Sequence, residues 1–90
     1  MEETDDSWTT KAQDAATESA VLRQLLDLHP SRVTSAELIR ELAGETPEFA
    51  QRDAIDRAIR DLAGTGLVHR GDELLTPTRA ALRFNELLNR

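Results

Sequence analysis

Apolar residues recur along most of this chain at the three-to-four-residue spacing of an amphipathic helix. The first such stretch predicts a helix from Thr10 to Leu28. The His29-Pro30 pair should end this helix, because the residue before a proline is kept out of helical geometry. Residues 31–34 hold a single apolar side chain and are expected to form a minimal strand.

A second helix is predicted to begin at a capping box formed by Thr34 and Glu37. In that motif each side chain accepts a hydrogen bond from the other residue's backbone N–H. The helix should run through Ala43 and stop at Gly44, because glycine suits the left-handed conformation common after a helix end.

The start of the third helix is open between two positions. Thr46 could cap a helix that begins at Pro47, or a short turn could precede a helix that begins near Gln51. We favour the second alternative, with the helix ending at Ala63. Phe49 is then expected to fill the core.

The stretch from Leu67 to Leu75 predicts a β-hairpin, with strands over 67–69 and 73–75 and with Gly71 supplying the positive φ of the turn. The Thr76-Pro77-Thr78 segment then predicts the start of a last helix that continues through about Leu88. The expected fold is mostly α with a small β-hairpin (α+β), in the order helix, strand, helix, helix, strand, strand, helix.

The apolar positions of these elements predict the core. The expected core residues are Ala12, Ala16, Ala20, Val21, Leu25, Leu28, Leu38, Ile39, Leu42, Ile55, Ala58, Ile59, Leu62, Ala80 and Ala81. The last helix also carries Leu82, Phe84, Leu87 and Leu88, which span more than one of its faces and either line the core or pair with a second copy.

Charge changes this picture, because it is distributed unevenly. The net charge is −6, and residues 1–20 hold six acidic residues against one lysine, whereas residues 21–90 hold eleven acids and ten arginines. We therefore expect an acidic, flexible leader over residues 1–10 and a nearly neutral single domain over residues 11–90. No apolar run is long enough to span a membrane, and no secretory signal is recognisable, so a cytoplasmic protein is the simplest interpretation.

Two segments carry a family resemblance. Residues 54–62 (AIDRAIRDL), followed by Gly66-Leu67-Val68-His69-Arg70, resemble the recognition-helix-to-wing segment of MarR-type and related small winged helix regulators. The segment from Val33 to Leu38 resembles the first strand and second-helix entry of the same proteins. The resemblance covers about residues 20–88 and implies a winged helix-turn-helix fold, with a recognition helix at 51–63 and a wing at 67–75. The chain departs from the pattern in its long second turn and in its lack of net positive charge.

The implied function is double-stranded DNA binding, and five residues are the candidate contacts. A helical projection places Arg57 and Arg60 opposite the apolar stripe, where they would meet phosphates or guanine edges. Gln51 and Arg52 lie at the N-terminal end of the same helix, and Arg70 lies at the wing tip. The competing interpretation is a solvated face, since acid–arginine pairs four residues apart stabilise a bare helix.

A protein–protein interaction module on the same fold is the rival function, in which the neutral helix face and the acidic leader would meet a protein partner. A variant of the rival has the leader fold back over the arginines as an autoinhibitor. Trp8 could dock on the domain or on a partner, or have no role.

Catalytic, metal and cofactor sites are not expected. The chain has no cysteine, and its two histidines, His29 and His69, are forty residues apart in sequence. The terminal helices carry more apolar residues than a monomer of this size buries easily. We therefore expect a homodimer formed through the terminal helices, which would present two recognition helices to two half-sites.

Overall fold

A computed structural model describes the backbone of residues 2–89 and the side chains of residues 10–89. This part of the chain contains four helices and a three-stranded antiparallel sheet, which is the expected α+β composition in the expected order. The elements are α1 (Glu2–Leu28), β1 (Val33–Thr34), α2 (Ser35–Ala43), α3 (Phe49–Thr65), β2 (Val68–Gly71), β3 (Leu74–Pro77) and α4 (Arg79–Leu88).

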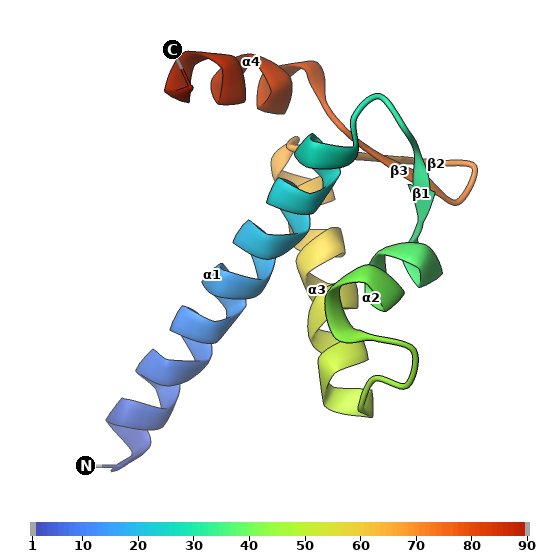
Figure 1. Ribbon diagram of the computed structural model, residues 1–90. Helices are drawn as coiled ribbons and strands as arrows, with labels where there is room; N and C mark the ends of the chain where they lie inside the picture. Colours follow the sequence, from blue (N-terminus) through green and yellow to red (C-terminus); the bar gives the residue numbers. More distant parts are fainter. Residues whose placement is uncertain (1, 90) are drawn as a thin grey trace.

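The long helix α1 packs chiefly on α3, α2 contacts both of them, and the sheet lies at one end of the helices (Figure 1). The helix α4 follows β3 and projects away from the rest of the molecule (Figure 1). None of the helices within residues 2–89 combines the length and the apolar character needed to cross a membrane.

The core lies where α1, α2, α3 and the sheet meet. Its largest fully buried side chains are Leu25, Leu38, Ile59, Leu75 and Val21. The predicted stripe of α3 is buried throughout, whereas that of α2 is buried at Leu38 and Ile39 and only partly buried at Leu42. The predicted stripe of the first helix was wrong in its N-terminal half: Ala12, Ala16 and Ala20 are exposed.

The sheet has the strand order β1-β3-β2, so β3 is central. Gly71 pairs with Leu74, which leaves a two-residue loop of Asp72 and Glu73. Both loop residues have positive φ, 53° and 64°, as a type I′ turn requires. The expectation that Gly71 supplies the positive φ was therefore wrong. The turn lies one residue further along, because Gly71 pairs as the last residue of β2.

Several element bounds also differ from expectation. α1 begins at Glu2 rather than Thr10. The flexibility of the leader stays a prediction, and the Trp8 side chain lies outside the described residues.

The bounds of α3 and α4 differ as well. α3 begins at Phe49, between the two alternatives, and ends at Thr65. Pro77 is the buried last residue of β3 rather than the start of α4, whose N-cap is Thr78.

Phe49 does not fill the core. Its side chain is 82% exposed, because as the first residue of α3 it lies beyond the layer where α1, α2 and α3 meet. The predicted capping box of α2 is confirmed: the Thr34 N–H donates to Glu37 Oε1 at 2.8 Å, and the Glu37 N–H donates to Thr34 Oγ1 at 3.1 Å.

Candidate nucleic-acid interface

The helix α3 turns an apolar stripe inward and a charged face outward. Ile55, Ile59 and Leu62 are buried in the core. The exposed charged side chains of the middle of α3 are Asp53, Asp56, Arg57, Arg60 and Asp61. This face therefore carries three carboxylates and two guanidinium groups, so it is mixed in charge rather than basic.

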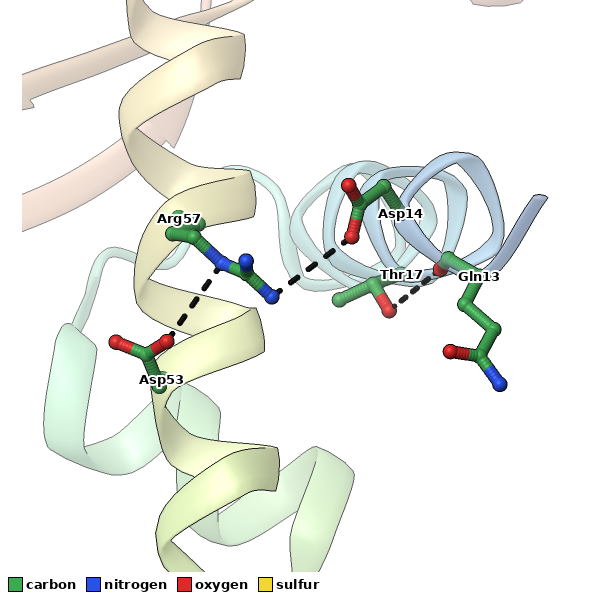
Figure 2. A network of polar contacts seen from close by, with 5 residues as sticks. All are labelled: Gln13, Asp14, Thr17, Asp53 and Arg57. Carbon is green, nitrogen blue, oxygen red and sulfur yellow. Dashed lines mark hydrogen bonds and ion pairs between the residues drawn. The ribbon is translucent and has the colours of Figure 1, made fainter. Parts of the chain in front are cut away.

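Arg57 lies between α3 and α1 and contacts acids on both helices (Figure 2). Its Nη2 is 3.8 Å from Asp14 Oδ1, and its Nε is 3.7 Å from Asp53 Oδ2. The three side chains are about half exposed, at 48%, 48% and 54% for Arg57, Asp14 and Asp53. Exposed pairs at such distances contribute ~0–1 kcal/mol each, so Arg57 is held in place only weakly.

Arg60 is the unpaired arginine of this face. It is exposed and makes no ion pair with any residue in the part of the chain that the structure describes. Its guanidinium group is therefore free to meet an anionic ligand without first breaking a contact.

Arg52 lines an open groove of about 430 Å³ between α2 and α3. Ser35 and Ala36 at the start of α2 form one end of the groove, and Pro47 lies on the connection between the two helices. That connection spans residues 44–48, a length between those of the two alternatives that the sequence left open.

Arg70 lines a second groove, of about 390 Å³, between the β2–β3 hairpin and the start of α2. Ser35 and Ala36 line this groove as well. The N-terminus of α2 therefore lies between Arg52 of α3 and Arg70 of the hairpin. The capping box uses the Glu37 N–H of this helix, so the N–H groups of Ser35 and Ala36 are the ones left at its start to attract an anion.

The sequence gives no sign of this convergence, because Arg52, Arg70 and Ser35 are far apart along the chain. A capping box identifies where a helix starts, but it does not say which other elements lie beside that start. The N-terminus of α2 is thus a candidate contact that the sequence-based interpretation missed.

Gln51 does not line the groove of Arg52. It lines a cleft against Ala16 and Thr17 of α1, and its Oε1 accepts a hydrogen bond from the Glu48 N–H at 3.1 Å. Its side chain caps α3 in this arrangement. The five predicted contact residues are all exposed, but they do not form one cluster.

The two histidines, distant in sequence, line the same pocket. His29 after α1 and His69 of β2 lie with Arg32 and Thr76 around a hollow of about 370 Å³ on the outer face of the sheet. Among residues 10–89 no group of three or more metal-ligating side chains is placed to hold a metal ion.

An apolar groove of about 600 Å³ runs between the two terminal helices. Leu22 and Leu26 of α1 line one side, and Phe84 and Leu88 of α4 line the other. Phe84, Leu88 and Leu87 are 60%, 67% and 47% exposed, so the described chain does not bury them in its core. Ala80, expected in the core, is exposed as well. These side chains lie on the projecting helix, which has too few neighbours to cover them.

Comparison of the chain with protein-family models, with curated proteins and with solved structures finds no match. Any functional interpretation must therefore come from the surface described above: the charged face of α3, the N-terminus of α2, the hairpin and the groove between α1 and α4.

Proposed function

We propose that this protein is a winged helix DNA-binding protein that acts as a small homodimeric transcriptional regulator. In this proposal α3 enters the major groove and the β2–β3 hairpin is the wing. The element order and the central position of β3 support the winged helix assignment. The observation that carries the function is the placement of Arg52 and Arg70 on either side of the α2 N-terminus.

This arrangement suits a DNA backbone. Arginine forms bidentate hydrogen bonds with phosphate oxygens, and backbone N–H groups at a helix start make the same kind of contact. The surface that contains Arg52, the α2 N-terminus and Arg70 would position the protein on the duplex. Arg60 and, once released from Asp14 and Asp53, Arg57 would reach the base edges or further phosphates.

The carboxylates of α3 limit the affinity. Asp53, Asp56 and Asp61 would repel phosphates, so sequence-independent binding should be weak. Specific binding would then depend on shape complementarity and on two half-sites bound together. A second copy of the chain, paired through the α1–α4 groove, would supply the second recognition helix one helical turn of DNA away.

The test is selection of bound duplexes from a random DNA pool by the full chain at low and moderate salt. We expect enrichment of a two-fold-related motif, and affinity that falls steeply with salt because phosphate contacts release counterions. Arg52→Ala and Arg70→Ala should each lower the salt slope by about 1. The matched control is Arg79→Ala, an exposed arginine at the start of α4, which should leave binding unchanged.

Asp14→Asn tests whether α1 itself, beyond the leader, inhibits DNA binding by covering Arg57. It removes one partner of Arg57 and one negative charge, so DNA affinity should rise about two- to fivefold if Asp14 competes with phosphate. An unchanged affinity would rule out Asp14 as an inhibitor and would leave the main proposal intact.

A protein–protein interaction module is the second candidate, and two observations favour it. The exposed face of α3 carries more acids than arginines between Asp53 and Asp61, and Phe49 exposes an aromatic ring at the start of the same helix. Absence of any enriched duplex with a folded protein would contradict DNA binding and favour this second function.

A further inference from the structure

The outer face of the sheet carries a pocket that the proposed function does not use. Three of its residues come from adjacent parts of the sheet. His69 of β2 pairs with Thr76 of β3, and Arg32 lies one residue before β1, where the β1–β3 register, extended by one residue, places it level with Thr76. His29, which follows the end of α1, lines the pocket together with these three residues. The four side chains line the same hollow of about 370 Å³, which we call the outer-sheet pocket.

The basic side chains of this pocket have no partners among the described residues. Arg32, His29 and His69 are exposed and make no ion pair or side-chain hydrogen bond with any residue of the described chain. Asp72, on the turn, is the one acidic residue lining the pocket. In a protein with a net charge of −6, three unpaired basic side chains from three segments therefore converge on one hollow.

The donors of the pocket match one kind of ligand. A guanidinium group binds phosphate oxygens bidentately, protonated imidazoles donate from both ring nitrogens, and a hydroxyl such as that of Thr76 adds a further donor. Pro30 and Pro77 line the pocket as well and offer no N–H or charged group. The volume of about 370 Å³ exceeds that of a lone phosphate group, so the pocket has room for what the phosphate is attached to.

We propose that the outer-sheet pocket binds a phosphate group, held by Arg32, His29 and His69. The phosphate could belong to a small phosphorylated molecule or to a nucleic-acid backbone, which present the same chemistry. This site lies on a different surface from Arg52 and the α3 face, so it does not rest on the proposed DNA-binding function.

The experiment is an NMR titration of the full chain with inorganic phosphate, against sodium chloride at equal ionic strength. It is run at about pH 6. We expect saturable shifts of the imidazole signals of both His29 and His69. Arg32→Gln should weaken binding about tenfold because it removes a charge-assisted contact. Arg79→Gln, the matched control on α4, should leave it unchanged.

Two further ligands identify the source of the phosphate. If adenosine monophosphate shifts both imidazoles and a short random duplex does not, the site takes a small phosphorylated molecule. If the duplex shifts both imidazoles and Arg32→Gln weakens this effect, the site takes a backbone phosphate. Either result supports the proposal.

Shifts that grow linearly with phosphate, or that are equal in the wild type and the Arg32→Gln variant, would overturn it. Duplex binding that depends on Arg52 and Arg70 but leaves both imidazole signals unshifted, with no binding of phosphate or adenosine monophosphate, would overturn the phosphate site. The proposed DNA-binding function would then stand. Phosphate binding without any duplex binding would overturn only the DNA-binding function.

Discussion

At the residue scale, the β2–β3 turn contains one residue that suits its backbone conformation and one that does not. Asp72 and Glu73 both have left-handed φ values, which aspartate tolerates better than glutamate does. A glutamate in this conformation brings its Cβ close to a carbonyl oxygen, which costs ~1 kcal/mol. The backbone of the turn is therefore set by the pairing of Gly71 with Leu74 rather than by the preference of Glu73.

Replacing Glu73 with glycine should therefore stabilise the protein. Glu73→Gly creates the Asp-Gly pair favoured in type I′ turns, and we expect the free energy of unfolding to rise by ~0.5–1 kcal/mol in urea denaturation. The control is Glu41→Gly, an exposed position inside α2, where the same change should lower the free energy of unfolding by about as much. Destabilisation by Glu73→Gly would mean that the turn has a different conformation.

At the element scale, α4 is the least supported part of the fold. It has ten residues, and only Ala81 is buried. A helix of this length is marginal in water without tertiary contacts. Thr78 links it to the end of α3, because its Oγ1 donates to Gly66 O at 2.7 Å and accepts from the Ala81 N–H at 3.2 Å.

Thr78→Ala removes both hydrogen bonds at once. We expect the free energy of unfolding to fall by ~1–2 kcal/mol, because the change removes a helix N-cap and leaves the Gly66 carbonyl without this donor. Thr78→Ser keeps the hydroxyl and should recover most of the loss. Chemical denaturation measures both variants, and an equal loss in Thr78→Ser would show that the methyl group, not the hydroxyl, stabilises the start of α4.

At the scale of the whole molecule, the groove between α1 and α4 is the largest apolar feature described above. Phe84 and Leu88 line one side and Leu22 and Leu26 the other. A two-fold arrangement would place α4 of each copy against α1 of the other. Full burial of an exposed Phe or Leu side chain stabilises the folded state by ~1.5–3 kcal/mol. In a two-fold dimer both copies contribute the same residues, so each burial is counted once in each protomer.

Phe84→Glu tests this dimer. We expect the wild type to sediment as a dimer, with a melting temperature that rises with protein concentration, and Phe84→Glu to sediment as a monomer. Phe49→Glu makes the same chemical change at an exposed phenylalanine on α3 and should remain dimeric. A monomeric wild type, or loss of the dimer in Phe49→Glu, would contradict pairing through the terminal helices.

Local patterns along the chain were sufficient to predict the order of the elements. Helical periodicity, the Thr34–Glu37 capping box and the proline after α1 act over a few residues, so they can be recognised without knowledge of the tertiary structure. The inward stripe of α3 was predictable for the same reason, because Ile55, Ile59 and Leu62 lie on one helical face.

Only the tertiary structure decided which distant residues meet. The pairing of Arg57 with Asp14, the position of the α2 N-terminus between Arg52 and Arg70, and the pocket shared by His29 and His69 join different elements. The exposure of Phe49 and Phe84 was also decided by the tertiary structure. Periodicity shows that a side chain is apolar and on which helical face it lies. Whether another element covers that face depends on how the helices pack in space.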